Sequence, residues 1–192
     1  MHVLVVLGSP GQKGATRVVV EEVAERLKKA GAHVDLLDFQ EDPLPLFNPE
    51  TSYAAPGYAA LQKRVARADV LLLATPDYHG CMSSTLKNFL DHFWKEYAGK
   101  LMATLVGSYD KGLTVTDQLR TAARQCYAWT LPYGVVFADK TDVLPEGVLA
   151  EGLQARLDML THDMMVYGTL LARQREADLA GSAPGFLARY RS

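Results

Sequence analysis

Residues 3–11 read Val-Leu-Val-Val-Leu-Gly-Ser-Pro-Gly, and this stretch sets the fold class. An unbroken apolar run of this length is typical of a strand buried on both faces, as in a parallel sheet. The glycines and the proline that follow end the strand in a turn. A helix pattern comes next, with apolar side chains at Val20, Val23, Ala24 and Leu27 and charged ones between them. Gly31 is placed to close that helix, so the chain opens with a strand–turn–helix unit.

The same alternation continues along the chain. Further buried strands are predicted at residues 33–39, 69–75, 101–106 and 133–137. Further helices are predicted at residues 58–67, 86–97, 119–126 and 149–173. Strands that alternate with helices in this way predict a doubly wound α/β sheet with right-handed crossovers. Residues 40–57 form a long connection rich in proline and glycine, and such connections are usually functional or part of a partner surface.

The composition is that of one ordinary globular domain. The 192 residues include 20 basic and 22 acidic ones, for a net charge of −2, and a domain holds roughly 150 residues. We expect a single domain over residues 1–176 and a C-terminal tail over residues 177–192. The slight acidic excess argues against a nucleic-acid partner, and two cysteines cannot form a disulfide framework. Because no long apolar run or signal-peptide pattern is found, we expect a cytoplasmic protein without membrane contact.

The loops after the first, third and fourth strands are the candidate site, because ligands of open α/β sheets bind beyond the carboxyl ends of the strands. In the first loop, glycines permit close backbone approach and a helix N-terminus offers free N–H groups. Hydroxyl donors and positive charge come from Ser9, Lys13, Thr16 and Arg17. This composition suits a phosphate, although neither the Walker A motif nor the dinucleotide fingerprint is present. A plain glycine-rich turn with Thr16 as the helix N-cap explains the same residues equally well.

The second and third loops are polar and bounded by turn residues. In the second, Pro76 and Gly80 indicate a turn directly after the third strand. We expect Ser83 or Ser84 to cap the following helix, and its Lys87 and Asp91 have the spacing of a surface ion pair, the simplest interpretation of this segment. The third loop, residues 107–112, either meets the other two around one ligand or is an ordinary turn.

Other chemistries find little support in the sequence. The histidines lack the spacing of a metal site, so no metal is predicted. No Gly-x-Ser-x-Gly elbow follows a strand, which argues against a hydrolase of that class. Cys126 lies on an apolar helix stripe and is predicted to fill the core. Cys81 is interpreted as a small space-filling residue of the second loop rather than a reactive thiol.

With the loops placed, the chain resembles the NADPH-dependent FMN reductase family of the flavodoxin-like fold, which includes quinone, azo and chromate reductases. The resemblance covers residues 1–140 and is carried by Gly8-Ser-Pro10 through Thr16-Arg17, Leu44-Pro-Leu46, Pro76-Asp-Tyr-His-Gly80 and Leu86-Lys-Asn-Phe-Leu-Asp91. The pair of motifs in the second loop is the most specific part. The sequence departs from the family pattern at His79, where asparagine is commoner, and at Cys81, which is often serine. The cysteine cluster of the iron–sulfur branch is absent.

The resemblance implies a five-stranded parallel sheet in the order 2-1-3-4-5, with helices on both faces. It also implies FMN as the cofactor and NADPH or NADH as the reductant. The FMN phosphate would lie in the first loop, at Ser9, Gly11, Lys13, Thr16 and Arg17. The isoalloxazine ring would lie against the second and third loops, at Pro76, Asp77, Tyr78, His79, Gly80, Gly107 and Ser108. No catalytic side chain is expected, because a flavin carries the chemistry itself.

The implied activity is an NAD(P)H oxidoreductase in which hydride passes from NAD(P)H through FMN N5 to a quinone, a flavin, an azo compound or a similar acceptor. Backbone N–H groups of residues 76–80 would stabilise the reduced ring. A flavodoxin-type electron carrier is an alternative, although carriers are usually strongly acidic and this chain is not. A binding domain that shares the fold without flavin is another.

The last helix bears on oligomeric state. Its apolar residues alternate spacings of four and three at Leu153, Leu157, Leu160, Met164, Tyr167 and Leu171. Packing onto the sheet is the simpler explanation of this stripe, and a dimer contact is the alternative. Because family members are commonly dimers or tetramers, the resemblance implies a homodimer or homotetramer. Its edge aromatics would be Tyr53, Tyr58, Trp94, Tyr97 and Tyr109.

Overall fold

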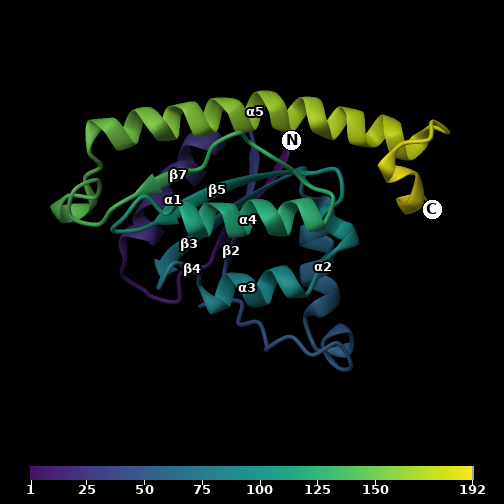
Figure 1. Ribbon diagram of the computed structural model, residues 1–192, viewed down its shortest axis with the longest axis horizontal. Helices are drawn as coiled ribbons and strands as arrows, with labels where there is room; N and C mark the ends of the chain where they lie inside the picture. The colour runs from purple at the N-terminus through teal and green to yellow at the C-terminus, as the bar shows by residue number, and fades with distance from the viewer. Residues whose placement is uncertain (192) are drawn as a thin grey trace.

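The computed structural model describes residues 1–191 and shows a twisted sheet covered by helices on both faces (Figure 1). Its strands are β1 His2–Leu7, β2 His33–Asp38, β3 Val70–Tyr78, β4 Cys81–Met82, β5 Leu101–Gly107, β6 Trp129–Thr130 and β7 Val135–Phe137. They are hydrogen-bonded in the order β2-β1-β3-β5, with β6 and β7 both paired to β5. All pairs are parallel except β3 with β4. The predicted doubly wound α/β class is confirmed.

Two details of the sheet differ from the prediction. The fifth predicted strand, residues 133–137, is shortened to β7, and an additional short strand, β6, precedes it along β5. Pro132 lies between them and has no N–H to donate to a ladder. Next to it, a Cβ on Gly134 would lie 2.3 Å from Thr104 Oγ1, so the chain passes very close to β5 there. The second difference is β4, which adds an antiparallel hairpin to the end of β3.

The helices form two layers. Helices α1 Ala15–Lys29 and α5 Glu151–Ala180 cover one face of the sheet, and α2 Tyr58–Arg67, α3 Ser84–Asp91 and α4 Leu113–Gln125 cover the other. The alternation of side chains in β1 serves both layers, because Val3, Val5 and Leu7 join the first core and Leu4 and Val6 the second. This is why the opening run is apolar at every position.

Helix α1 ends where the sequence predicted. Gly31 takes a left-handed conformation with φ of 90°. Its N–H donates to the carbonyl of Lys28 over 2.9 Å, and the N–H of Ala32 donates to that of Leu27 over 3.0 Å. These two bonds form a Schellman cap, for which glycine is the preferred residue.

The predicted helix over residues 86–97 is wrong in its second half. Helix α3 ends at Asp91, and a separate 3₁₀ helix runs from Lys95 to Tyr97. Trp94 breaks the helical path with φ −142° and ψ −70°. Phe93 and Tyr97 are nevertheless buried in the second core. Their apolar spacing therefore reflected burial, which a 3₁₀ turn satisfies as well as an α-helix does.

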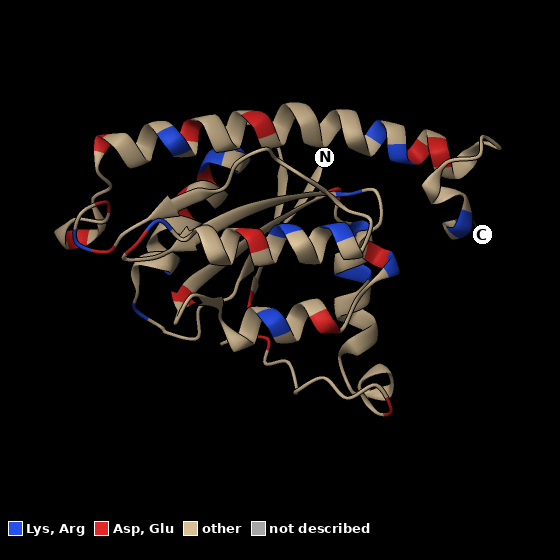
Figure 2. Cartoon of the chain, viewed as in Figure 1, with Lys and Arg blue, Asp and Glu red and all other residues tan. Residues whose placement is uncertain are grey.

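The last helix is longer than predicted. Helix α5 continues to Ala180, and a 3₁₀ helix from Phe186 to Tyr190 follows it, with Leu187 buried. Part of the segment expected to be a tail is therefore helical. The stripe from Leu153 to Met164 packs onto the sheet, whereas Tyr167 is half exposed. Figure 2 shows basic and acidic residues interspersed along α5 and α4. Within residues 1–191, no helix has the length and apolar composition needed to cross a membrane.

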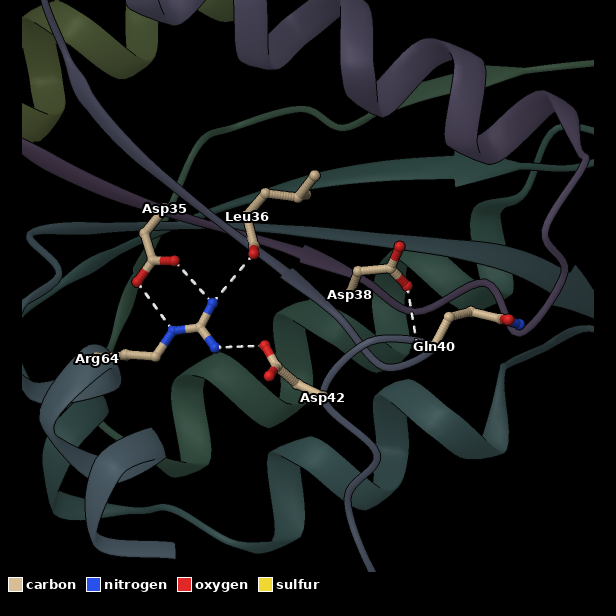
Figure 3. A network of polar contacts seen from close by, with 6 residues as sticks. All are labelled: Asp35, Leu36, Asp38, Gln40, Asp42 and Arg64. Atoms are coloured by element: carbon tan, nitrogen blue, oxygen red, sulfur yellow. Dashed lines mark hydrogen bonds and ion pairs between the residues drawn. The ribbon is translucent and has the colours of Figure 1, made fainter. Parts of the chain in front are cut away.

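The connection after β2 is anchored at its start by one arginine. Figure 3 shows Arg64 of α2 forming a bidentate pair with Asp35 of β2 at 2.7 and 3.0 Å, together with a bond to Asp42 at 2.7 Å. The same guanidinium donates to the carbonyl of Leu36 over 3.0 Å. The fork geometry of arginine lets one side chain join helix, strand and loop.

Candidate functional site

The loops after β1, β2, β3 and β5 meet at the carboxyl edge of the sheet. From β1 the chain crosses to β2 on one side, and from β3 it crosses to β5 on the other. The carboxyl ends of the paired strands β1 and β3 are therefore the topological switch point, the place where proteins of this architecture bind their ligands. Three of these four loops are the ones singled out in the sequence.

The first loop presents backbone donors that have no partner. Within residues 1–191, the N–H groups of residues 11–16 make no hydrogen bond. Gly14 is the N-cap of α1 in an extended conformation without any side-chain cap, so the interpretation of Thr16 as the N-cap is wrong. A run of free N–H groups at a helix N-terminus is a binding site for an anion. Ser9 and Thr16, which carry the hydroxyls of this loop, are both buried.

Two glycines let the loops approach one another closely. A Cβ on Gly8 would lie 2.7 Å from both the carbonyl oxygen of Ala74 and the Cβ of Leu86. A Cβ on Gly107, at the end of β5, would lie 3.0 Å from Thr16 Oγ1 and 3.1 Å from the ring of Phe137. The first and third loops therefore lie side by side, and bare backbone lines the space between them.

The second loop is a hairpin rather than an irregular loop. Pro76, Asp77 and Tyr78 belong to β3, and the turn is made by His79 at φ 58° and Gly80 at φ 75°. Two successive positive φ values are those of a type I′ turn, which favours glycine at its second position. Tyr78 and His79 are exposed at its tip. Cys81 is exposed as well, which corrects its interpretation as a space-filling residue.

Asp77 joins the hairpin to the third loop. Its Oδ1 accepts the N–H of Gly80 over 2.7 Å, and its Oδ2 accepts the hydroxyl of Ser108 over 2.9 Å. Gln118 of α4 supports the hairpin from the other side. It accepts the N–H of Met82 and donates to the carbonyl of Gly80, both over 3.1 Å. Gln118 was not predicted as part of the site, because nothing in its local sequence distinguishes it from a surface glutamine.

Ser83 connects the second loop to the first. Its Oγ accepts the N–H of Leu86 over 3.1 Å, which confirms the predicted cap of α3. The same hydroxyl donates to the carbonyl of Gly8, and the Ser83 N–H donates to Thr75 Oγ1 over 2.9 Å. The end of β1 and the start of α3 are therefore held together by one buried serine.

Asn88 of the Leu-Lys-Asn motif is hydrogen-bonded to the connection after β2. Its side chain accepts the N–H of Phe47 over 2.8 Å and donates to the carbonyls of Leu44 and Pro45. It thus fixes the connection after β2 against α3. A pocket of about 520 Å³ opens between this connection, the first loop and the start of α3, lined by Pro10, Phe39, Gln40, Pro43, Leu44, Leu46, Ser84, Thr85 and Asn88. The predicted surface pair of Lys87 and Asp91 is confirmed.

Arg17 lies against a carboxylate rather than free in the loop. Its Nη1 is 2.6 Å from Oδ2 of Asp38, the last residue of β2, and its buried Nε has no partner within residues 1–191. Burial alone would raise the pKa of Asp38. The hydrogen bonds from Arg17 and from the N–H of Gln40 outweigh burial and hold that pKa below its usual value. The pair is therefore ionised at neutral pH.

The structure accordingly brings Ser9, Thr16, Gly107, Ser108 and the hairpin of residues 76–80 to one edge. Lys13 is exposed at the rim of the first loop. Within the described part of the chain, no group of three or more His, Cys, Asp or Glu residues is placed to hold a metal ion. Free N–H groups, small hydroxyls and an adjacent exposed hairpin suit a ligand with a phosphate at one end and a flat ring at the other.

Comparison with known proteins identifies a family and several similar proteins. The NADPH-dependent FMN reductase family matches residues 1–142. An NADPH azoreductase of Bacillus sp. (strain OY1-2) is 32% identical over 140 residues, which cover 71% of this chain and 76% of that protein. An FMN-dependent NADPH-azoreductase of Staphylococcus aureus (strain USA300) is 28% identical over 113 residues, covering 56% and 60%. The fold is similar to that of an NADH:FMN oxidoreductase, with a TM-score of 0.72 at 16% identity and coverage of 86% and 89%.

Proposed function

The chain belongs to the NADPH-dependent FMN reductase family, and on that basis we propose that it is an FMN-dependent NAD(P)H oxidoreductase that reduces a small organic acceptor. The acceptor class that we propose is a quinone, a flavin or an azo compound, since the names of its relatives include azoreductases. The observation that carries the proposal is the set of free N–H groups of residues 11–16 beside Gly107 and the braced hairpin.

The first loop fits the phosphate of FMN. The free N–H groups of residues 11–16 and the hydroxyls of Ser9 and Thr16 supply donors for it. The unpartnered, buried Nε of Arg17 adds a further donor, and Lys13 adds positive charge at the rim. Hydrogen bonds from such groups to a phosphate are the strong, charge-assisted kind.

The hairpin and the third loop fit the flat ring. Hydrogen bonds join Asp77 of the hairpin to Ser108 of the third loop and Gln118 of α4 to the carbonyl of Gly80. This surface is therefore fixed in shape before a ligand arrives. The N–H of Gly80 is already taken by Asp77, whereas that of His79 makes no hydrogen bond within residues 1–191. His79 is thus the backbone donor of this turn best suited to face the ring.

The chain's own part in the reaction is binding and orientation. Bound FMN supplies the group that takes hydride from NAD(P)H and gives it to the acceptor, so no protein nucleophile or general acid is required. The exposed tip of the hairpin, with Tyr78 and His79, leaves one side of the site open to nicotinamide and acceptor in turn. In view of its nicotinamide reductant, we also propose a cytoplasmic location.

The test is the absorbance spectrum of the purified protein, taken before and after addition of FMN and then of NADPH without oxygen. We expect a yellow protein–flavin complex that bleaches with NADPH and regains colour when a quinone or an azo dye is added. A protein that neither binds FMN nor oxidises NADPH would overturn the proposal and leave the fold in place. Parallel turnover with each acceptor and with NADH against NADPH would identify the preferred pair.

We further propose a homo-oligomer, a dimer or a tetramer. Tyr53, Trp94 and Tyr109 are more than half exposed and are available to an interface. Tyr97 was predicted to be an edge aromatic and is instead fully buried, and Tyr58 is packed against the second core. Light scattering at micromolar protein tests this proposal, and a monomer mass would overturn it.

A further inference from the structure

The first loop is held mainly by contacts with residues outside it. Within residues 1–191, the N–H groups of residues 11–16 make no hydrogen bond, and the backbone bond inside the loop is that of the Arg17 N–H to the carbonyl of Gly14, over 3.0 Å, where α1 begins. Its two ends, Pro10 and Arg17, are each tied to the same short segment at the end of β2. That segment is Asp38 to Gln40, which Figure 3 shows at the point where β2 gives way to the next connection.

The tie at Arg17 is an ion pair. Nη1 of Arg17 donates to Oδ2 of Asp38 over 2.6 Å, and both residues are largely buried. Arg17 stands in the first turn of α1, so this pair sets where that helix begins relative to the sheet. Because the pair is shielded from water, the Coulomb attraction between its two groups is stronger than in an exposed ion pair, and loss of one partner would leave the other charge buried.

The contact at Pro10 depends on the same carboxylate. Oδ1 of Asp38 accepts the backbone N–H of Gln40 over 3.0 Å, which orients the residue. The side-chain amide of Gln40 then donates to the carbonyl oxygen of Pro10. Arg17, Asp38, Gln40 and Pro10 thus form one continuous chain of hydrogen bonds that closes around the loop.

We propose that Asp38 is a positioning residue for phosphate recognition, holding the loop of residues 10–17 in its binding shape through Arg17 and Gln40. This inference rests on the proposed function, because the phosphate is that of FMN. Asp38 need not touch the ligand. Its effect is to remove the cost of ordering the loop when the phosphate binds, which is the general benefit of preorganisation. It also holds Nη1 of Arg17, which leaves the free N–H groups, the hydroxyls, Lys13 and the Nε of Arg17 to bind the phosphate.

The experiment compares FMN with riboflavin, which has the same ring but no phosphate. Dissociation constants for both are measured by flavin fluorescence in the wild type, Asp38→Asn and Asp35→Asn. Asp35 is the matched control, because it also lies on β2 and also pairs with an arginine, Arg64, but does not contact the loop. We expect Asp38→Asn to weaken FMN about tenfold or more, as for loss of a charged hydrogen bond, while riboflavin stays within about twofold. Asp35→Asn should leave both ligands within about twofold of the wild type.

Equal loss of FMN and riboflavin affinity in Asp38→Asn would overturn the inference, since it would show a general structural defect. Unchanged FMN binding would overturn it as well, because the ion pair would then have no effect on phosphate recognition. Tighter FMN binding would also overturn it, because Arg17 released from Asp38 would then bind the phosphate itself. Gln40→Leu is the second variant in case Asp38→Asn does not fold, since it cuts the bond to Pro10 and leaves the ion pair. It should weaken FMN several-fold and leave riboflavin unchanged. A wild type that binds neither flavin would instead overturn the proposed function.

Discussion

The hydroxyl of Ser108 donates to Oδ2 of Asp77 over 2.9 Å, and this bond joins the loop after β5 to the hairpin after β3. The other oxygen of the same carboxylate holds the N–H of Gly80 inside the hairpin turn. Two of the three loops of the candidate site are therefore one unit. The contribution of that unit to flavin affinity can be measured separately from the contribution of the loop after β1.

Asp77→Ala should weaken FMN and riboflavin equally, by about tenfold or more, because hydrogen bonds to a charged group are lost on the side of the site that would face the ring. Flavin fluorescence titration of both ligands checks this. The control is Asp91→Ala, which removes an exposed carboxylate of α3 that pairs with Lys87 on the surface. Loss of FMN affinity alone in Asp77→Ala would place the phosphate, rather than the ring, against the hairpin.

Thr16→Val should weaken FMN about tenfold without lowering the melting temperature, because it removes a hydroxyl donor and keeps the shape of the side chain. Arg17→Ala should lower both FMN affinity and melting temperature, because it leaves the largely buried Asp38 without its partner. Calorimetry and FMN titration of the two variants separate these effects. Unchanged FMN affinity in both variants would refute the assignment of the phosphate to this loop.

Gly107→Ala should reduce FMN binding and destabilise the fold by about 1–3 kcal/mol, the usual cost of overpacking. The new methyl would lie 3.0 Å from Thr16 Oγ1 and 3.1 Å from the ring of Phe137. Gly152→Ala is the control, because a Cβ there meets nothing within 4 Å and the residue lies in the first turn of α5. That variant should be at least as stable as the wild type, measured by denaturant unfolding.

Lys100 should make stability depend on pH above neutrality. Its Nζ donates to the carbonyls of Val65 and Ala66 over 2.6 and 2.9 Å, at the end of α2. Burial, with a smaller effect of Arg175, lowers the pKa of Lys100 to about 7, whereas an unfolded lysine has a pKa of about 10.4. Between these values the unfolded chain binds more protons, so stability rises with pH by about 1.4 kcal/mol per unit. Below about pH 7 both states are charged, and this lysine contributes no slope.

Denaturant unfolding of the wild type and Lys100→Met across pH 6 to 10 measures this effect. The difference between the two free energies of unfolding should be flat up to about pH 7 and then move in favour of the wild type. Parallel pH profiles for the two proteins would show that Lys100 does not titrate in this range.

The strands could be predicted because a strand buried on both faces is an unbroken run of apolar residues in the sequence. Runs such as Val3 to Leu7 are apolar at every position, and each forms the strand expected of it. The separate short strand β6 before Pro132 and the end of α3 before Trp94 could not be predicted from periodicity. No glycine or proline marks residues 92–94, and the apolar spacing continues through the break. Tertiary packing of Phe93 and Tyr97 decided the local conformation there.

The edge of the sheet that carries the site could also be predicted, because Ser9, Pro76 and Gly107 each follow a strand that was predicted from the sequence. The partners of the side chains could not. Nothing local to Arg17 indicates that a carboxylate 21 residues away, Asp38, would hold it. Likewise, Asn88 was expected as part of a motif, but its three bonds to residues 44, 45 and 47 depend on how a long connection folds back.

The unpaired N–H groups of residues 11–16 have a consequence for amide hydrogen exchange. Without a bonding partner, these amides should exchange with solvent deuterium far faster than their neighbours in β1 and α1, although they lie between two well-ordered elements. Occupation of the loop by a phosphate would slow them selectively. The protein therefore carries, in a few consecutive amides, an internal reporter of ligand binding that requires neither colour nor turnover.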